Sequence, residues 1–314
     1  MRLLTRIADV QRALDKERET GRRVGFVPTM GFLHDGHASL MRRARAENDI
    51  VVVSIFVNPL HFGANEDLAA YPRDLDSDLS LCEAEGVDVV FHPDVTEMYP
   101  GSEASARGTA ARGAAQPEQV GQSPTANPFT ITVGEIGTKL CGRARPGHFD
   151  GVATVVAKLL NISGPCRAYF GRKDAQQLVV IERLARALNF PVTVVGCDIV
   201  REPDGLAMSS RNVYLKEDER RAALVLRHTL DEATAAIRGG ERDARRIESL
   251  MGSRISSEPL AKLDYAAVVD TETLDDLEQL AGPALLAVAA WVGKARLIDN
   301  TTVTPQGASS EGSS

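Results

Sequence analysis

Residues 50–57 (Ile-Val-Val-Val-Ser-Ile-Phe-Val) limit the possible folds of this chain more than any other stretch. Nearly every side chain in the run is apolar, most are β-branched, and they do not alternate with polar residues. Such a run is typical of a strand buried on both faces, and strands of that kind belong to parallel sheets covered by helices on both sides. We therefore expect a central parallel β-sheet.

Short apolar runs alternate with helical patterns along the first two hundred residues. The predicted strands span residues 24–27, 50–57, 87–91, 167–170 and 192–195. The predicted helices span residues 38–48, 75–85, 152–160 and 175–188. Because strand–helix alternation implies parallel strands joined by right-handed crossovers, the pattern predicts an α/β fold with a doubly wound parallel sheet.

The pattern changes after about residue 200. Two charged, amphipathic helices and then three closely spaced strands are predicted over residues 217–238, 244–257, 263–269, 285–292 and 295–298. Helices followed by neighbouring strands indicate a small α+β domain with an antiparallel sheet. We place the boundary near Ile199, which gives one domain at 1–199 and another at 200–300.

Two segments lack the apolar side chains that build a core. Residues 102–127 consist mainly of Ala, Gly, Ser, Thr, Pro and Gln, with Val120 as the one sizeable aliphatic side chain. Residues 301–314 end in a Gly/Ser-rich stretch from Gln306 onward. Such segments bury too little surface to offset their ordering entropy. We expect 102–127 to be a dispensable, disordered surface insertion and 301–314 to be a flexible tail.

Composition disfavours several classes of protein. Asp and Glu (43) outnumber Lys and Arg (36), and the resulting net charge of -7 argues against nucleic acid as a partner. The four cysteines form no CxxC pair, which is typical of reduced thiols. The first residues lack the apolar core of a signal peptide, and no stretch approaches the roughly twenty apolar residues of a membrane span. We expect a cytoplasmic protein with no membrane or nucleic-acid partner.

The strongest local motif is Pro-Thr-Met-Gly-Phe-Leu-His-Asp-Gly-His at residues 28–37. It lies between a predicted strand and a predicted helix, where a parallel α/β sheet binds its ligands. Gly31 and Gly36 allow the backbone to approach a ligand closely, and a helix opening near His37 would point unpaired amides and its positive dipole end at the loop. With His34 three residues earlier, the motif forms a cradle for negative charge, and phosphate is the expected guest.

Two histidines at this spacing can also ligate a metal. A catalytic zinc site normally needs a third protein ligand, and Asp35 is the only local candidate. Its side chain would point elsewhere if His34 and His37 share a face. Phosphate contact is therefore favoured, and no metal ligand is assigned among the side chains.

Two further clusters carry polar side chains. In Tyr-Phe-Gly-Arg-Lys-Asp-Ala-Gln-Gln (169–177), Lys173 suits phosphate oxygens, Asp174 is placed to cap the next helix, and Gln177 lies one turn further on. In Met-Ser-Ser-Arg-Asn (208–212), two hydroxyls and a guanidinium can close over phosphates and stabilise charge during transfer. Alone, the first would be an ordinary solvated Lys–Asp pair and the second an ordinary polar linker.

Taken together, the clusters resemble the pantothenate synthetase (pantoate–β-alanine ligase) family of HIGH-type nucleotidyltransferases. The HxGH pattern is shared with other nucleotidyltransferases and with class I tRNA synthetases, whereas the ordered set of motifs is specific to this family. The resemblance runs from the N-terminus to about residue 300 and is interrupted by 102–127. The matching stretches are residues 28–37, 56–59, 71–73, 145–149, 151–159, 170–177 and 208–212.

The resemblance implies a Rossmann-like N-terminal domain that binds nucleotide and pantoate, a smaller C-terminal lid domain and a homodimer. It also implies a two-step reaction. ATP and (R)-pantoate would give an enzyme-bound pantoyl adenylate and pyrophosphate, with Mg²⁺ on the phosphates. β-Alanine would then attack the mixed anhydride, yielding pantothenate and AMP.

Individual residues receive roles from the same resemblance. His34, His37 and Lys173 would contact the triphosphate, and Ser209, Ser210 and Arg211 would close over it from the second domain. Other nucleotide contacts would come from Met30, Gly171, Asp174 and Met208. The pantoate pocket and the mouth of the active site would be lined by Asn58, His61, Tyr71 and Gln177. No residue is singled out as the base for the β-alanine amine.

The sequence departs from the family pattern at one of these positions. Where the family usually reads FVNPxQF, with the glutamine holding pantoate, residues 56–62 read Phe-Val-Asn-Pro-Leu-His-Phe. His61 is shorter than glutamine, has one donor and one acceptor when neutral, and can titrate near physiological pH. We expect weakened or pH-dependent affinity for pantoate rather than loss of function.

Two alternatives remain open from the sequence. A nucleotidyltransferase acting on a phosphate acceptor would need a basic pocket, whereas Asn58, Tyr71 and Gln177 supply amide and hydroxyl groups. A nucleotide-binding regulator without turnover would be compatible with His61. The chain retains both motif histidines together with Lys173 and Arg211. Their joint presence argues against this second alternative.

Overall fold

The structure is a computed structural model that describes residues 1–63, 68, 71–100 and 129–305. The insertion predicted at 102–127 and the stretch from Gln306 onward lie outside the described residues. The chain forms two compact units. The first comprises Met1–Thr138, Gly142–Gly171 and Val180–Cys197, and the second comprises Lys139–Cys141, Arg172–Val179 and Asp198–Ser314. Two short segments, 139–141 and 172–179, thus belong to the second unit although sequence order alone assigns them to the first predicted domain.

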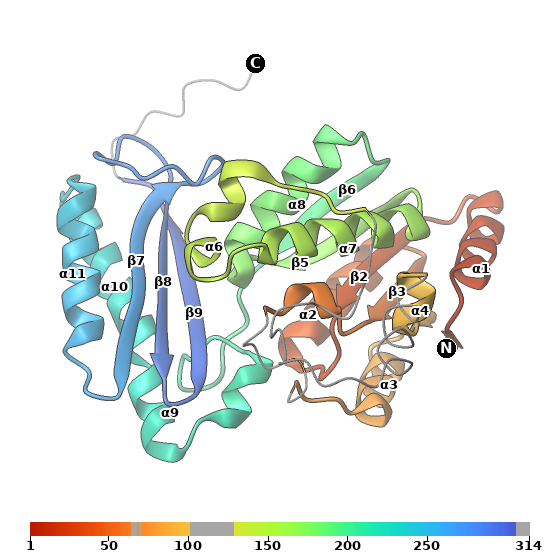
Figure 1. The fold of residues 1–314 in the computed structure, drawn as a ribbon, viewed down its shortest axis with the longest axis horizontal. Coiled ribbons are helices and arrows are strands. Elements are labelled where there is room, and N and C mark those ends of the chain that lie inside the picture. Colours follow the sequence, from red (N-terminus) through yellow and green to blue (C-terminus); the bar gives the residue numbers. More distant parts are fainter. Residues whose placement is uncertain (64–67, 69–70, 101–128, 306–314) are drawn as a thin grey trace, which may run out of the picture. The chain divides into compact units, whose positions relative to one another are not determined.

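The first unit is built on a six-stranded sheet whose strands are all parallel (Figure 1). In spatial order the strands are β1 (Arg2–Leu4), β4 (Val89–Phe91), β3 (Ile50–Ile55), β2 (Val24–Thr29), β5 (Cys166–Gly171) and β6 (Val192–Cys197). All six residues of β3 are buried. The prediction of a parallel sheet around this run is therefore confirmed, and its physical basis is burial on both faces.

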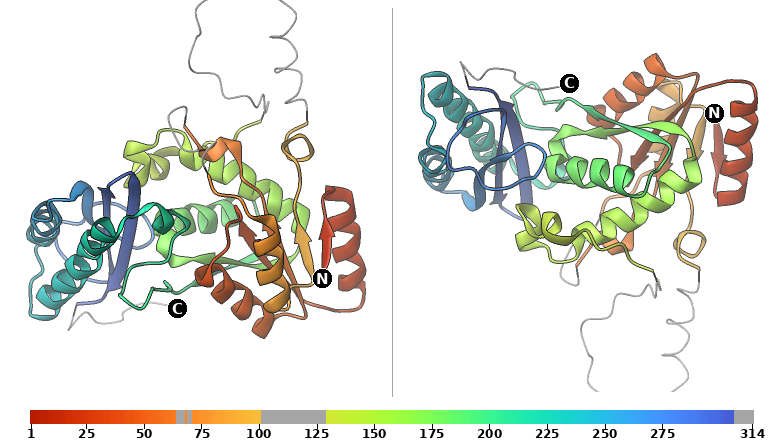
Figure 2. Two further views of the ribbon diagram at one scale, coloured as in Figure 1. Left: turned by 90° about the horizontal axis from the view of Figure 1, so that it is seen from below. Right: turned by 90° about the horizontal axis from the view of Figure 1, so that it is seen from above.

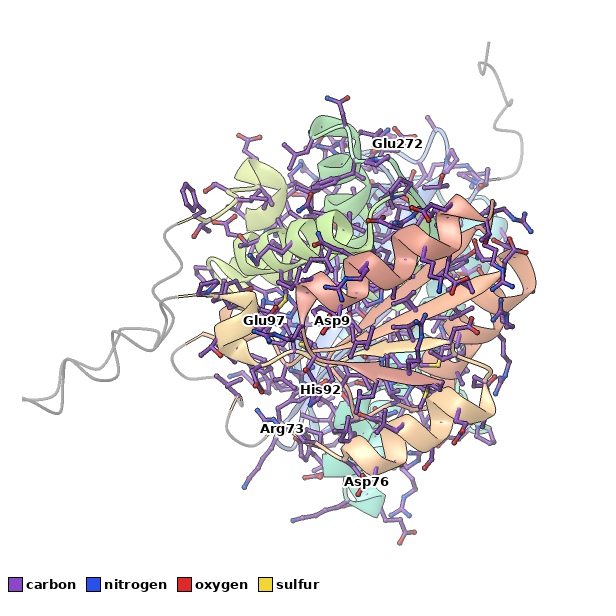
Figure 3. The ribbon with its side chains drawn as sticks, turned by 90° about the vertical axis from the view of Figure 1, so that its right-hand side faces the viewer. Asp9, Arg73, Asp76, His92, Glu97 and Glu272 are labelled. Atoms are coloured by element: carbon purple, nitrogen blue, oxygen red, sulfur yellow. The ribbon has the colours of Figure 1, made fainter. Side chains whose placement is uncertain are left out.

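Helices cover both faces of this sheet. The helices before residue 200 are α1 (Ile7–Glu19), α2 (Asp35–Glu47), α3 (Leu75–Ala84), α4 (Val95–Met98), α6 (Cys141–Ala144), α7 (His148–Ser163) and α8 (Ala175–Ala187), and the 3₁₀ turns are η1 (Pro59–His61), η2 (Gly134–Thr138) and η3 (Arg172–Asp174). Of these, η3 and the first residues of α6 and α8 belong to the second unit. The strands lie between α1, which carries Asp9, and α3, which carries Asp76 (Figure 3). On the α2 side, Leu40, Met41 and Ala44 pack into one core with residues of β3.

Several element boundaries differ from the prediction for local reasons. β3 ends at Ile55 rather than at residue 57, because the Phe56 amide makes a last bond to the Thr29 carbonyl before the chain turns into Pro59. α2 begins at Asp35 rather than near residue 38, because His34 caps it. α7 is longer than predicted at both ends, from His148 to Ser163.

The strand order reverses at β2. The two strands that follow it in sequence, β3 and β4, lie on one side of it, whereas β5 and β6 lie on the other. The connections after β2 and β5 therefore lead to opposite sides, which makes the carboxyl ends of these two strands a topological switch point. In open α/β sheets this topological switch point is where ligands bind.

The second unit contains a three-stranded antiparallel sheet, β7 (Ala261–Asp270), β8 (Ala284–Val292) and β9 (Ala295–Val303), as predicted. Its helices are α9 (Glu217–Ala223), α10 (Val225–Arg238) and α11 (Ala244–Ser256), preceded by the 3₁₀ turn η4 (Ser210–Tyr214). Figure 2 shows α10 and α11 side by side on one face of this sheet, where their apolar side chains form a common core with alternate residues of β8.

Two expectations about this unit are wrong. The helix predicted over residues 217–238 is interrupted at Leu224, whose amide bonds to Arg221 three residues back instead of four. The predicted tail begins too early, because residues 301–303 pair with Leu286, Leu285 and Ala284 as the last part of β9. No helix in the described parts of either unit is long and apolar enough to cross a membrane.

Candidate active site

The histidine loop, residues 30–37, leaves the end of β2 at the switch point. Its backbone takes a left-handed turn, with φ of 82° at Gly31 and 50° at Phe32. Thr29 prepares this turn, because its hydroxyl donates to the Ser54 carbonyl (2.7 Å) and accepts from the Gly31 amide (3.2 Å). The start of the loop is thereby fixed to β3 through the last residue of β2.

Asp78 of α3 holds the middle of the histidine loop. One carboxylate oxygen accepts from the Phe32 amide (2.9 Å) and the other from the Leu33 amide (2.6 Å). Asp78 is only 3% exposed, and burial raises its pKa while the two amides lower it. A Cβ at Gly31 would lie 2.9 Å from an Asp78 oxygen, so glycine is required there by contact as well as by φ.

His34 and His37 form a reciprocal cap at the start of α2. The Gly36 amide donates to Nδ1 of His34 (3.1 Å), and the His34 amide donates to Nδ1 of His37 (3.3 Å). Their rings are 4.1 Å apart, centroid to centroid. Because each Nδ1 accepts a hydrogen bond, the proton of each neutral ring must be on Nε2. Both Nε2 atoms are therefore donors, which is the property that a phosphate oxygen requires.

The structure corrects the predicted role of the backbone amides in the anion site. Unpaired backbone amides at the start of the helix were expected to meet the ligand. Instead, the Gly36 amide is bonded to the His34 ring, and the amides of His37 and Ala38 are bonded to the His34 carbonyl. The described geometry therefore favours imidazole donors and the helix dipole over amides as the source of positive potential.

His61 lies on η1 beside the histidine loop. Its Nδ1 is 3.1 Å from the Met30 sulfur, and its carbonyl is bonded to the side chains of Arg145 (3.0 Å) and His148 (2.9 Å). Burial lowers the pKa of His61 well below its ordinary value, and the nearby His148 and Arg145 lower it further. The expectation that His61 titrates near physiological pH is therefore wrong, because the ring is kept neutral by its surroundings.

Asn58 and Tyr71 are buried in the same unit. The Asn58 side chain is 1% exposed, accepts from the Tyr99 hydroxyl (2.8 Å) and the Leu60 amide (3.3 Å), and donates to the Gly151 carbonyl (3.3 Å). Tyr71 is 5% exposed and packs edge-on against Phe62. These contacts give Asn58 a clear part in shaping η1, and its contact with pantoate stays a prediction.

Gly171 closes β5 at the same edge of the sheet as the histidine loop, since β5 pairs with β2. A Cβ built on Gly171 would meet no atom of the described chain within 4 Å. Packing of the protein itself therefore does not require glycine here, in contrast to Gly151, where a Cβ would lie 2.0 Å from the Leu60 carbonyl oxygen.

Within the second unit, Lys173 and Asp174 lie on η3 with their charged groups 3.9 Å apart. The turn is held by Asn300 of β9, whose side-chain amide donates to the carbonyls of Arg172 (3.0 Å) and Lys173 (2.8 Å). Gln177 is half-buried, whereas the adjacent Gln176 is buried and bonded to the backbone of Lys139 and Cys141.

The remaining predicted residues form a turn in the second unit. Met208 donates to the Val200 carbonyl (3.0 Å), Ser209 caps η4 by accepting from the Arg211 amide (3.3 Å), and Ser210 begins η4. The turn is anchored by Asn212, which donates to the Glu202 carboxylate (3.0 Å) and to the Ala207 carbonyl (3.1 Å).

The predicted residues thus fall into two sets, each ordered within its own unit. The first unit holds Met30, His34, His37, Asn58, His61, Tyr71 and Gly171, and the second holds Lys173, Asp174, Gln177, Met208, Ser209, Ser210 and Arg211. Sequence reasoning missed Asp78 and Asn300, which hold two of these loops, and it assigned no role to Asn212 although the motif at 208–212 includes it. In the described residues, no three His, Cys, Asp or Glu side chains gather as a metal site would require.

Comparison with known proteins gives a consistent result. A family model described as Pantoate-beta-alanine ligase matches residues 2–302. "Pantothenate synthetase" of Thermotoga neapolitana is 51% identical over 301 residues, covering 96% of this chain and 99% of that protein. "Pantothenate synthetase" of Clostridium botulinum strain Kyoto is 46% identical over 302 residues, with the same coverage.

Solved structures agree with the sequence relatives. The pantothenate synthetase from Thermus thermophilus superposes with a TM-score of 0.83 at 42% identity, covering 96% of this chain and 99% of that one. The pantoate–β-alanine ligase from Francisella tularensis, described as complexed with β-γ ATP and β-alanine, has a TM-score of 0.71 at 31% identity, with coverages of 96% and 97%.

Proposed function

The chain belongs to the pantoate–β-alanine ligase family, and on that premise we propose that it condenses (R)-pantoate with β-alanine at the expense of ATP, through an enzyme-bound pantoyl adenylate. Family membership makes it a ligase of pantothenate biosynthesis. The observation that most strongly supports ATP chemistry is the pair of Nε2–H donors of His34 and His37, at the start of a helix and at the switch point of the sheet.

The first step joins two anions. A pantoate carboxylate oxygen attacks the α-phosphorus of ATP, a P–O bond forms, and the bond to pyrophosphate breaks. The protein must hold like charges in line and stabilise the charge that spreads over the phosphoryl oxygens. We assign this to the imidazoles of His34 and His37, to the ammonium of Lys173, and to Ser209, Ser210 and Arg211. Met30, Gly171, Asp174 and Met208 are assigned to nucleotide contact.

The second step forms the carbon–nitrogen bond. The neutral amine of β-alanine attacks the acyl carbon of the adenylate, the carbon–oxygen bond to AMP breaks, and the nitrogen loses one proton. The Francisella tularensis relative is described as complexed with β-γ ATP and β-alanine, which supports this choice of nucleotide and amine.

The pantoate pocket is assigned to Asn58, His61, Tyr71 and Gln177. A neutral His61 supplies one donor and one acceptor where the family usually has a glutamine. Because the ring stays neutral, the expected consequence is a weakened affinity for pantoate that is nearly constant from pH 6 to 8.

The remaining assignments follow the family. Mg²⁺ is proposed to enter on the ATP phosphates, its usual oxygen ligands. The active form is proposed to be a cytoplasmic homodimer, with ATP, (R)-pantoate and β-alanine as its small-molecule partners.

The test is release of pyrophosphate from ATP and Mg²⁺, first with pantoate alone and then with β-alanine added. The proposal predicts a stoichiometric burst with pantoate and steady turnover once β-alanine is present. His34→Gln should slow the burst by about 100-fold or more, the cost of losing one transition-state donor. His228→Gln, an exposed site on α10, serves as the matched control. ATP binding without pyrophosphate release under either condition would point to a non-catalytic nucleotide binder instead.

A further inference from the structure

We propose that Asp78 is a positioning residue of the nucleotide site, acting through the backbone of the histidine loop to aim His34 and His37. The inference rests on the proposed function only for the identity of what the two imidazoles bind. Its structural content, one carboxylate that determines the geometry of two rings, is independent of the ligand.

The contact is specific in its geometry. Asp78 lies in the first turn of α3, and its two oxygens accept from two consecutive amides, Phe32 and Leu33, at 2.9 and 2.6 Å. His34 follows immediately, and its ring and that of His37 each accept an amide of the same loop. A displacement at Leu33 is therefore transmitted directly to the peptide that carries His34.

Only a carboxylate satisfies this arrangement. An ionised carboxylate offers acceptors on both oxygens, whereas an asparagine offers one oxygen and turns an NH₂ group toward the second amide. Gly31 completes the fit, because a side chain there would collide with Asp78. The bonds to two amides are charge-assisted and the carboxylate is almost fully buried, so its loss leaves two partly buried amides without this partner.

The arrangement also determines which part of the loop meets phosphate. Successive amides in a left-handed turn form a concavity that binds anions. Asp78 occupies the amides of Phe32 and Leu33, so these two donors are directed to α3. We therefore assign the contact with an anion to the imidazoles of His34 and His37, whose Nδ1 atoms accept amides of the loop.

The decisive experiment compares Asp78→Asn with Asp76→Asn. Both change one carboxylate of α3 to an amide, but Asp76 is exposed (Figure 3). Imidazole ¹⁵N NMR reports the tautomers of His34 and His37, assigned with the His34→Gln and His37→Gln variants among the six histidines of the chain. Asp78→Asn should mix the tautomers of both rings. Asp76→Asn should leave the Nε2–H form intact.

Kinetics give a second readout. Asp78→Asn should lower kcat/KM for ATP by about 100-fold, the scale of an ångström misplacement, and leave KM for β-alanine within about twofold of the native value. A side chain that only stabilised the fold would lower the Tm and leave both the tautomers and the kinetic parameters of the folded fraction unchanged. That result would overturn the proposal.

Gly31→Ala provides an independent route should Asp78→Asn not fold. Its Cβ pushes against the same carboxylate, so it should produce the same mixed tautomers and the same loss for ATP. In the double variant the two losses should be far from additive, because both act on one contact. Additive losses, or native tautomers in Gly31→Ala, would contradict a positioning role.

The two proposals fail separately. A native chain that releases no pyrophosphate, together with tautomers that change in Asp78→Asn, would remove the proposed function and keep the positioning role. A native chain that turns over, with native tautomers and kinetics in Asp78→Asn, would remove the positioning role alone.

Discussion

His61 shows how the surroundings of one residue change what its side chain can do. The ring nitrogen Nδ1 faces the Met30 sulfur, and within the described residues the buried Nε2 has no hydrogen-bond partner. Adding a proton would place a charge in this interior, beside Arg145 and His148. The lowered pKa follows from that cost. Protonation of His61 therefore lowers the stability of the fold and does not act as a pH switch for binding.

The pH dependence of stability has a defined sign. In the unfolded chain His61 takes up a proton near its ordinary pKa of about 6.5, whereas in the folded chain it does so only at lower pH. The unfolded state therefore binds more protons between these two values, so the free energy of unfolding falls as the pH falls below about 6.5. The slope from this group approaches about 1.4 kcal/mol per pH unit.

His61→Gln should remove that contribution. Urea unfolding from pH 5 to 7 should show a shallower loss of stability in His61→Gln than in the native chain. Parallel curves for the native chain and His61→Gln would show that His61 is not the titrating group.

The variant Gly171→Ala can separate an effect on nucleotide binding from an effect on the stability of the fold. A methyl group there meets no described atom within 4 Å, so Gly171→Ala should leave the Tm unchanged or slightly raised. If nucleotide approaches this position, the same methyl should raise KM for ATP roughly tenfold, equivalent to about 1.4 kcal/mol of binding.

Two glycines serve as controls for this variant. Gly282→Ala makes the same change in open space away from the motifs and should alter neither property, whereas Gly151→Ala should lower the Tm because its Cβ collides with the Leu60 carbonyl. A native KM for ATP in Gly171→Ala would remove Gly171 from the nucleotide contacts.

At the scale of secondary-structure elements, two functional loops are held by a buried polar side chain from a distant part of the chain, and the third by a buried side chain of its own. Asp78 reaches the histidine loop from α3, Asn300 reaches η3 from β9, and Asn212 anchors the turn after Met208. Asp78 lies on a helix and Asn300 on a strand, so the two loops that they hold inherit the rigidity of those elements. Such support is what a site needs to keep its geometry.

Asn300→Asp tests whether the Asn300 side chain anchors η3, the turn that carries Lys173. The substitution removes both donors and turns a buried carboxylate toward the carbonyls of Arg172 and Lys173. We expect a loss of roughly 3 kcal/mol in the free energy of unfolding and a raised KM for ATP. Asn189→Asp, at an exposed turn position, makes the same chemical change and should cost little. Equal losses in the two variants would show that the anchor contributes nothing.

The elements that sequence reasoning found and missed differ in a physical way. Strands such as β3 and helices such as α11 have long, regular apolar patterns, so their existence was predicted. No prediction covered β1, which has only three residues, or α1 after it. His34 and His37 were found because they are neighbours at a strand–helix junction. Asp78 was missed because it reaches its partner Phe32 across 46 residues of sequence.

At the scale of the whole molecule, the order of motifs along the chain carried more information than any one motif. Composition set the class of protein, and the alternation of strands and helices predicted the parallel sheet and the antiparallel one. What sequence order could not provide was the membership of segments 139–141 and 172–179 in the second unit. That depends on contacts such as Asn300 with Lys173, which span 127 residues and leave no periodic signal.

The central position of β2 also has a consequence for biosynthesis. Its partner β3 follows closely along the chain, but its other partner, β5, begins only at Cys166, long after β2 ends at Thr29. At a translation rate of about 5–20 residues per second, one edge of β2 waits on the order of ten seconds for its neighbour. During that interval the nascent chain carries an open, apolar strand edge, the kind of surface on which chains aggregate. The junction of β2 and β5 is also the switch point of the sheet, so the histidine loop at the end of β2 gains its second neighbouring strand only after β5 has been synthesised.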